Sequence, residues 1–414
     1  MSGQGATAPT LQRPAADLIE PVEEIEIAAA VGMAARRGAP LFVCGNETKS
    51  GMLRPVLAAR TLSTRGHTGI TLYSPQELVI SARAGTKLAT IVAAVAEQGQ
   101  HIIAEPPDLS ALFGSTAPQT LGGVVATNLS GPRRIAWGAM RDHVLGVRAV
   151  NGVGDVIRSG GRVLKNVTGL DLCKLLTGSH GTLGVITEVT LKVLPAPEMV
   201  GTIVLPGLDA GAGVAALSAA LGSPFGVSGA AWLPAGAAAR IPALAGFAAP
   251  VALVRIESFA PSVAYRTRKL CADLGLAAEI FDDAASRAVW RAVRDALPLP
   301  AAPDDAVWRV SVRPSAGPGV LRAVAEAGVR GFLDWGGGLV WLAGPADSAT
   351  HDAVAAAAQA AGGTWTLMRA PETLRVAVAV ISPEPAVLAR ITRRVKAALD
   401  PEGILNPGRL YAGL

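Results

Sequence analysis

The first regular elements along the chain are a helix and a buried strand. From Val22 an alanine-rich run carries acidic residues at its front and Arg36 and Arg37 at its back, and Gly38 follows it. Acids in the first turn and bases in the last complement the dipole of a helix, and glycine commonly ends one. The apolar run 40–44 is typical of a buried strand, and it leads into a polar loop bounded by Gly45 and Gly51.

Up to residue 195, the pattern predicts an α+β domain with unusually many glycines. Apolar runs and alternations of three to nine residues indicate strands, and one amphipathic run that ends at Gly99 indicates a helix. The strands are expected at residues 69–73, 77–83, 144–150, 156–158 and 185–193, and the helix at 87–98.

A second α+β domain is expected beyond the proline-rich linker 195–197, because strands and helices alternate there. The last segment, 396–414, changes character again and contains proline, glycine and asparagine. In the second domain, strands are expected at 251–257, 307–312 and 339–343, and helices at 262–274, 286–297 and 347–361.

Length and composition point to a folded chain of two or more domains. The chain has 414 residues, of which 50% are hydrophobic and 17% charged, which excludes an intrinsically disordered protein. The mean hydropathy of +0.39 comes largely from alanine, which drives membrane insertion weakly. The longest charge-free run, 210–239, contains Pro224, Pro234 and six glycines, so we expect no direct membrane span.

Charge and cysteine usage narrow the function classes. The 37 basic residues are scattered along the chain, whereas a nucleic-acid binder concentrates them, so we expect no nucleic-acid partner. Cys44, Cys173 and Cys271 are too far apart in sequence to form the paired motifs of zinc or iron–sulfur sites, and no metal site is predicted. An odd number of isolated cysteines favours a reducing compartment. We read residues 1–16 as a disordered tail of a cytoplasmic protein.

Four glycine-rich segments are candidates for ligand binding. The loop 45–51 could present backbone N–H groups to an anion, with Lys49 adding charge, although an ordinary strand-to-helix turn explains it equally well. It is no Walker A loop, because Thr48 stands where that motif has glycine. The strongest candidate for ligand binding is the segment 120–134, although a glycine-rich loop of an antiparallel sheet would also explain its composition. Segments 165–172 and 177–186 follow it. A GxGxxA match at 211–216 lacks the acidic partner of a dinucleotide site and is read as a helix entry.

The phrases LGGVVATNLSGPRR, KNVTGLDL, GSHGTLGVITEV and ILNPGRL, in this order, resemble the FAD-binding family of vanillyl-alcohol oxidase type. Within that family, the phrases resemble the FAD-binding E subunits of bacterial glycolate oxidase. The resemblance implies an α+β fold, with a PCMH-type FAD-binding domain at 17–196 made of subdomains at about 17–62 and 63–196. It further implies an α+β cap domain at 197–395 and a C-terminal segment, 396–414, that returns to the flavin.

By the same resemblance, the first loop holds the pyrophosphate of FAD, the segment after Pro118 lines the pyrophosphate and ring system, and Asn406 approaches the isoalloxazine. Glu47 must then point outward, because a carboxylate repels a diphosphate. The loop lacks the histidine or cysteine of covalently flavinylated relatives, so we predict noncovalent FAD. The implied FAD-binding residues are Gly45, Asn46, Glu47, Thr48, Lys49, Pro118, Gly122, Gly123, Thr127, Asn128, Gly131, Gly181, Gly184, Ile186 and Asn406.

Oxidation of a 2-hydroxy acid needs a cation for the carboxylate and a base for the hydroxyl proton. The cap offers four arginines as weak candidates for the cation, Arg255, Arg309, Arg313 and Arg375. A base is harder to find, because relatives place a metal-binding histidine cluster in the cap and this cap holds only His351, which we expect at a solvent-facing helix start.

We therefore expect an FAD subunit that works beside a homologous catalytic FAD subunit and passes electrons to an iron–sulfur subunit and a quinone. Glycolate or another small 2-hydroxy acid is the implied substrate, and the partner subunits would account for any membrane association. Two alternatives stay open. One is a self-sufficient FAD-dependent 2-hydroxy acid dehydrogenase, and the other is a scaffold subunit that has lost FAD.

Overall fold

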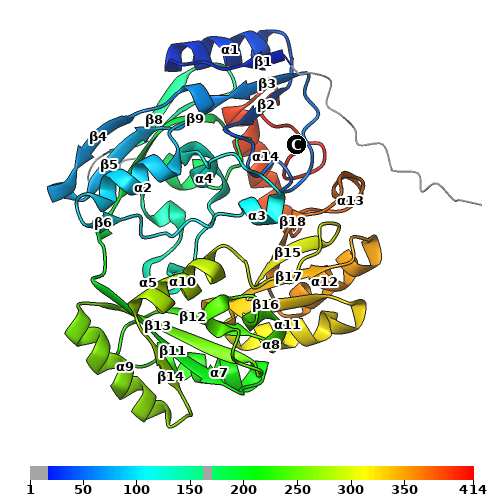
Figure 1. Ribbon diagram of the computed structural model, residues 1–414. Helices are drawn as coiled ribbons and strands as arrows, with labels where there is room; N and C mark the ends of the chain where they lie inside the picture. The colour runs from blue at the N-terminus through cyan, green and yellow to red at the C-terminus, as the bar shows by residue number, and fades with distance from the viewer. Residues whose placement is uncertain (1–16, 162–169) are drawn as a thin grey trace, which may run out of the picture.

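The computed structural model describes residues 17–161 and 170–414. The tail 1–16 and most of the segment 165–172 lie outside the described residues. Figure 1 shows two bodies stacked one above the other. The upper one, called here the first domain, contains the N-terminal elements and the C-terminal helix, and the lower one, the second domain, contains the chain between them.

The first domain starts with a small parallel sheet of order β1-β3-β2 beneath one helix. The strands are β1 (Asp17–Ile19), β2 (Leu41–Cys44) and β3 (Arg60–Ser63), and the helix is α1 (Glu24–Arg36). The Glu26 carboxylate accepts the backbone N–H groups of Val22 and Glu23, which caps the start of α1. The apolar face of α1 packs on β2, β3 and residues Ile404 and Leu405, so the far end of the chain completes this small core.

The larger part of the first domain is an antiparallel sheet of order β4-β5-β9-β7-β8. Its strands are β4 (Ile70–Ser74), β5 (Val79–Arg83), β7 (Val144–Val150), β8 (Val156–Gly160) and β9 (Val185–Lys192). Helices α2 (Leu88–Ala96) and α4 (Leu121–Thr127) share a buried cluster with this sheet. Short elements complete the domain: β6 (Gln100–His101), α3 (Ser110–Phe113), α5 (Arg134–Trp137), α6 (Leu172–Leu176) and β10 (Leu194–Pro195).

The second domain is built on one antiparallel sheet of order β14-β11-β13-β12-β16-β17-β15-β18. The strands are β11 (Met199–Pro206), β12 (Val227–Leu233), β13 (Val251–Ser258), β14 (Glu279–Phe281), β15 (Ala306–Ser311), β16 (Arg330–Asp334), β17 (Leu339–Gly344) and β18 (Thr364–Arg369). Its main helices are α7 (Ala210–Leu221), α9 (Ala260–Leu274), α10 (Asp283–Arg294), α11 (Gly317–Val324) and α12 (Ser348–Ala360), with a single turn at α8 (Ala235–Ala238).

The two faces of this sheet have different neighbours. Helices α7, α9, α11 and α12 cover the outer face, while α10 and the first-domain helix α5 lie on the face that looks toward the first domain (Figure 1). The GxGxxA match proves to be the start of α7, which Asp209 caps by accepting the N–H of Ala212. Within the described residues, no helix is both long enough and apolar enough to cross a bilayer.

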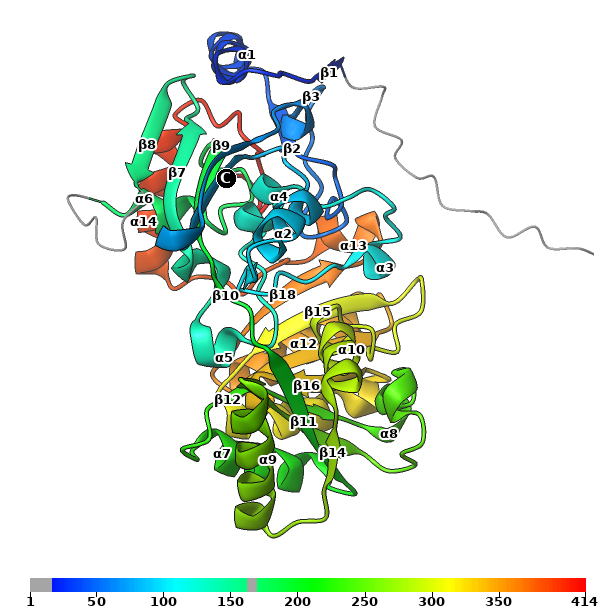
Figure 2. The same ribbon diagram turned by 60° about the vertical axis from the view of Figure 1, so that its left-hand side comes forward.

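After β18, the chain crosses back to the first domain through α13 (Glu372–Ala377) and α14 (Ala386–Leu399). Figure 2 shows α14, in red, close to the large sheet of the first domain. The expected boundary between residues 395 and 396 therefore falls inside a helix. At the end of α14, the ammonium of Lys396 forms a buried ion pair with Asp400 at 2.6 Å and also donates to the carbonyls of Thr182 and Leu405.

We predict that Asp400→Asn destabilises the first domain by about 3 kcal/mol, because it leaves a buried ammonium without its counter-charge. Urea unfolding followed by circular dichroism measures this change. Asp17→Asn is the matched control, because the Asp17 side chain is 78% exposed in its pair with Arg60, and its loss should cost less than about 1 kcal/mol. Equal effects of the two substitutions would contradict the structural role of the Lys396–Asp400 pair.

Candidate functional site

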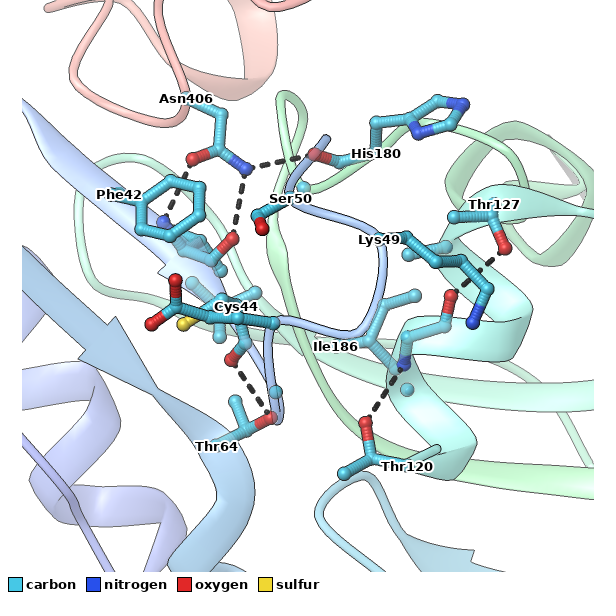
Figure 3. Close-up of a pocket in the computed structure, with 18 of the residues that line it drawn as sticks. Phe42, Cys44, Lys49, Ser50, Thr64, Thr120, Thr127, His180, Ile186 and Asn406 are labelled. Carbon is cyan, nitrogen blue, oxygen red and sulfur yellow. Dashed lines mark hydrogen bonds between the residues drawn. The ribbon is translucent and has the colours of Figure 1, made fainter. Parts of the chain in front are cut away.

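One cavity of the first domain is lined by residues of β2, α4 and β9 and holds about 770 Å³, counting space that opens to solvent. Figure 3 shows how five separate segments meet there. They are the end of β2 with the loop after it, residue Thr64, the start of α4, the turn before β9, and the C-terminal segment at Asn406 and Arg409.

The structure brings together twelve of the fifteen residues implied by sequence as FAD-binding. The cavity is lined by Gly45, Asn46, Glu47, Thr48, Lys49, Gly122, Gly123, Thr127, Gly181, Gly184, Ile186 and Asn406. Pro118 does not line the cavity but contacts a residue that does, because its carbonyl accepts the side-chain N–H of Asn46 at 2.8 Å. Asn128 and Gly131 are not among the lining residues. Asn128 ends α4 and accepts the N–H of Arg141, and the Gly131 carbonyl accepts the indole N–H of Trp335 in the second domain.

The segment 120–134 begins with the helix α4. It is therefore not the loop of an antiparallel sheet that was the alternative explanation for its glycines. Thr120 caps α4 by accepting the N–H of Gly123 at 3.3 Å. The backbone N–H groups of Leu121 and Gly122 donate to the carbonyls of Thr86 and Ala84. The N–H of Val124 donates to the carbonyl of Thr120. The start of this short helix therefore has its own donors satisfied, and the glycines there serve close packing.

Close contact at Gly45 sets the width of the cavity. A Cβ at Gly45 would lie 2.3 Å from Oγ1 of Thr120, nearer than atoms can approach. Ser63 and Thr64 hold this stretch of backbone by donating their hydroxyls to the carbonyls of Gly45 and Cys44. Glycine at position 45 is thus what allows the end of β2 to pass directly against α4.

The loop after β2 suits an anionic group. Among the described residues, no acceptor pairs with the backbone N–H groups of Asn46, Thr48 and Lys49. Amides left in this way within one short loop can together form a concave anion site. Glu47 has φ +53° and an exposed side chain, as a diphosphate beside this backbone would require. These features fit the diphosphate of FAD.

The cationic and imidazole groups of the cavity have shifted pKa values. Burial lowers the pKa of Lys49 to about 8, with Asp108 opposing the shift, and its ammonium donates to Gln119 and Thr48. Burial, reinforced by Arg409 and Lys49, lowers the pKa of His180 to about 3. At neutral pH the cavity therefore contains a neutral imidazole and a largely charged ammonium.

Asn406 organises the cavity from the C-terminal side. Its Oδ1 accepts the N–H of Val43 at 2.8 Å, and its Nδ2 donates to the carbonyls of Val43 and His180 at 3.0 and 2.8 Å (Figure 3). Both amide protons are thus used within the protein. The side chain of Asn406 thereby positions β2 and the turn at His180, and its expected approach to a flavin ring stays a prediction.

The four candidate arginines have different surroundings. Arg255 forms a bidentate pair with Glu105 at 2.9 Å, and Arg313 is exposed. Arg375 donates to the carbonyls of Ser50 and Leu53 and so holds the loop beside the cavity. Arg309 is stacked on two tryptophans. Arg255 and Arg375 therefore have protein acceptors that occupy their guanidinium groups.

Arg255 belongs to a buried charge network that joins the two domains. Glu105 and Arg133 come from the first domain, and Arg255 and Glu257 from β13 of the second. The four side chains are at most 11% exposed. Burial acts to raise the pKa of Glu105, but Arg255 and Arg133 hold it below its usual range. The carboxylate that Arg255 binds is thus the protein's own.

Sequence reasoning missed several lining residues and misplaced one histidine. Thr64, Thr120, His180 and Arg409 line the cavity, and the last three lie within or beside the quoted phrases, which was a usable signal. Cys44 also lines it, directly before the loop that was said to lack cysteine. His351 is buried, not solvent-facing, because α12 turns it inward, where its Nδ1 accepts the indole N–H of Trp308. Among the described residues, no three His, Cys, Asp or Glu side chains cluster as metal ligands would.

Comparison with known proteins identifies the family. The FAD binding domain family matches residues 15–160, and the C-terminal domain of FAD linked oxidases matches residues 385–410. Glycolate oxidase subunit GlcE of Escherichia coli (strain K12) is 35% identical over 376 residues, which are 91% of this chain and 93% of that protein. The chain belongs to the FAD-linked oxidases, in the family of this subunit. It is an FAD-dependent oxidoreductase acting on CH–OH groups, which confirms the resemblance drawn from the sequence.

Other FAD-linked oxidases match in part. D-lactate dehydrogenase of Anaerostipes hadrus is 33% identical over 46% of this chain and 38% of its own length. Glycolate oxidase subunit GlcD of Bacillus subtilis (strain 168) is 43% identical over 24% of this chain and 20% of its own. The solved structure of 4-ethylphenol oxidase from Gulosibacter chungangensis, at 15% identity, has a TM-score of 0.71 and covers 96% of this chain and 89% of that one. The expected PCMH-type α+β fold is confirmed.

We predict that Gly45→Ala weakens FAD binding, because the new methyl group must displace Thr120 at a cost of about 1–3 kcal/mol. Fluorescence titration of the apoprotein with FAD measures the change. Gly236→Ala is the control, because a Cβ there meets nothing within 4 Å.

A second substitution tests the cause of this loss. Thr120→Ala removes the colliding hydroxyl, so the double variant Gly45→Ala/Thr120→Ala should bind FAD better than the sum of the two single effects predicts. Strict additivity would show that the collision does not set the width of the cavity.

Proposed function

We propose that this chain is the FAD-binding subunit of a multi-subunit glycolate or related 2-hydroxy acid oxidase. In that complex it would work with a homologous catalytic FAD subunit and pass electrons through an iron–sulfur subunit to a quinone. The observation that carries the proposal is the convergence of twelve sequence-implied residues on one cavity, in a chain that aligns with GlcE over nearly its whole length. The existence of a named GlcD relative supports a complex of more than one flavin subunit.

The residues of the cavity would divide the work of holding FAD. The loop 46–49 would bind the diphosphate through its amides and the Lys49 ammonium, while Arg409 fixes that loop by donating to the carbonyl of Lys49. Ile186 and the glycines of α4 would line the rest of the cofactor. When bound, FAD supplies the acceptor for hydride from a C–H bond. We expect this binding to be noncovalent and the complex to be cytoplasmic, with membrane association only through partner subunits.

The second domain supports an assisting role for this subunit. Arg255, a candidate for binding the substrate carboxylate, is paired with Glu105 and Glu257 instead. His351 is packed between tryptophans, with Trp365 edge-on at 4.9 Å. Neither group is free to act on a substrate in this arrangement. The two alternatives, a self-sufficient dehydrogenase and an FAD-free scaffold, are distinguished by the experiments below.

We predict that FAD affinity depends on the charge of Lys49. The ammonium attracts the diphosphate fully below its pKa of about 8, and this attraction is lost as pH rises through that value. The Kd for FAD should therefore increase between pH 7 and 9.5. In Lys49→Met it should be about tenfold higher at pH 7 and nearly independent of pH. Lys87→Met, at an exposed position, is the control. A pH profile that Lys49→Met leaves unchanged would contradict this role.

The subunit assignment is tested with the purified chain, alone and co-expressed with its partner subunits. We expect a flavin spectrum from the chain alone, FAD release on denaturation, and glycolate-dependent dye reduction only in the complex. Full turnover by the isolated chain would favour the self-sufficient dehydrogenase. Failure to take up added FAD would favour the scaffold. Flavin that stays on the denatured chain would overturn noncovalent binding, and Cys44 and His180 would be the first residues to examine.

A further inference from the structure

Two arginines from different domains stack on one tryptophan where the domains meet. Arg134 comes from α5 of the first domain, and its guanidinium carbon lies 4.6 Å from the ring centre of Trp335. Arg309 comes from β15 of the second domain and lies 5.3 Å from the same ring and 5.1 Å from that of Trp341. Trp335 itself is fixed, because its indole N–H donates to the Gly131 carbonyl at 3.1 Å. The guanidinium groups of Arg134 and Arg309 thus contact the same aromatic ring, that of Trp335.

Within the described part of the chain, these two guanidinium groups lack acceptors, unlike their neighbours. Among the described residues, no oxygen accepts a hydrogen bond from the side chain of Arg134 or of Arg309. The Nε of Arg309 is also sealed from solvent. The adjacent Arg133 and Arg255, by contrast, each bind carboxylates in bidentate fashion. A guanidinium that is taken out of water without an acceptor is costly, so an acceptor from outside the chain would be bound favourably.

The charges around the pair also favour an anion. Burial and the nearby Arg134 lower the pKa of Arg309 to about 10, so both groups are cations at neutral pH and repel each other. Asp334 is the carboxyl that opposes this shift in Arg309, and burial raises its own pKa to about 7. Asp334 directs its Oδ1 to the N–H of Trp335 at 2.7 Å and forms no ion pair with either arginine in the described part of the chain. Asp142 is the carboxylate near Arg134, but it pairs with Arg141 and Lys174 instead. The positive charge of the pair is therefore incompletely balanced.

We propose that Arg134 and Arg309 form a binding site for the carboxylate of a small organic acid, with Trp335 as its floor. A planar carboxylate can accept two parallel N–H groups from each fork, which an isolated chloride cannot match. Both residues keep some exposed surface, and the Arg309 guanidinium is the more deeply buried of the two. That the acid is glycolate or another 2-hydroxy acid, or the 2-oxo acid formed from it, rests on the proposed function.

The position of the site links it to the flavin domain. Arg134 lies in the short helix that follows α4, whose residues Gly122, Gly123 and Thr127 line the cavity. Arg309 is on the face of the second-domain sheet that looks toward the first domain, where it meets Trp335 and Arg134. A bound carboxylate would therefore bridge the two domains beside the Glu105–Arg255 pair.

Glycolate binding to the FAD-loaded chain tests the proposal, with calorimetry and tryptophan fluorescence as readouts that do not depend on turnover. We expect saturable glycolate binding with a change in tryptophan emission. Ethylene glycol, which lacks the carboxylate, should give neither. Arg134→Gln and Arg309→Gln should each weaken binding by at least about tenfold, and Arg322→Gln, at an exposed arginine of α11, should leave it unchanged.

The conservative variants keep the test decisive if a glutamine variant fails to fold. Arg134→Lys and Arg309→Lys retain the charge but lose the planar fork, so we expect binding between those of the wild type and the glutamine variants. Saturable binding that none of the four variants weakens, or no saturable binding in the wild type, would overturn the site. Loss of FAD uptake with intact glycolate binding would instead overturn the proposed function, so the two failures are distinguishable.

A pH titration gives an independent readout. Ionised Asp334 would compete with the ligand for Arg309, so glycolate binding should weaken as pH rises through about 7. The groups that face Asp334 are the Trp335 N–H, Arg255 from β13, Arg309 from β15 and Glu105 from the first domain. Asp334→Asn should remove this pH dependence without loss of affinity at pH 6. Unchanged pH dependence in that variant would contradict the placement of the ligand beside Arg309.

Discussion

The cavity of the first domain depends on a clasp made by one side chain, that of Asn406. Its three hydrogen bonds connect the end of β2 to the turn at His180, and its own backbone N–H reaches the Leu41 carbonyl. The buried Lys396–Asp400 pair holds the segment that carries Asn406. Because these bonds are shielded from water and bring together parts of the chain remote in sequence, they determine where the walls of the cavity stand.

The second physical constraint is the charge network between the domains. Glu105 and Arg133 meet Arg255 and Glu257 in a nearly dry interface, and each charge there has a partner. Such a network adds little net stability, but removing one member is costly, so it fixes how the two bodies sit. The same pairing makes the neighbouring Arg134 and Arg309 unusual, because they lie at the same interface with an aromatic ring in place of a carboxylate.

Much of the fold could be predicted from the sequence because its elements follow local rules. The helix that starts near Val22 and the strand at 41–44 were predicted within about two residues, since caps, charges and apolar runs are local signals. The loop 45–49 was found because glycine, lysine and polar residues stand together there. His351 was misplaced, because only tertiary packing against Trp308 and Trp365 turns one face of α12 inward. The pairing of Arg255 with Glu105, 150 positions apart, had no sequence signal either.

The clasp at Asn406 also bears on how the molecule folds. Val43 and Asn406 are separated by 363 positions, with the entire second domain between them. Closing so long a flexible loop carries an entropic penalty, which shrinks when the intervening chain is already compact and presents its two ends side by side. Folding of the second domain thus brings the two parts of the first domain, which precede and follow it in sequence, close to each other. A substitution in the core of the second domain could therefore slow formation of the cavity in the first domain without contacting it.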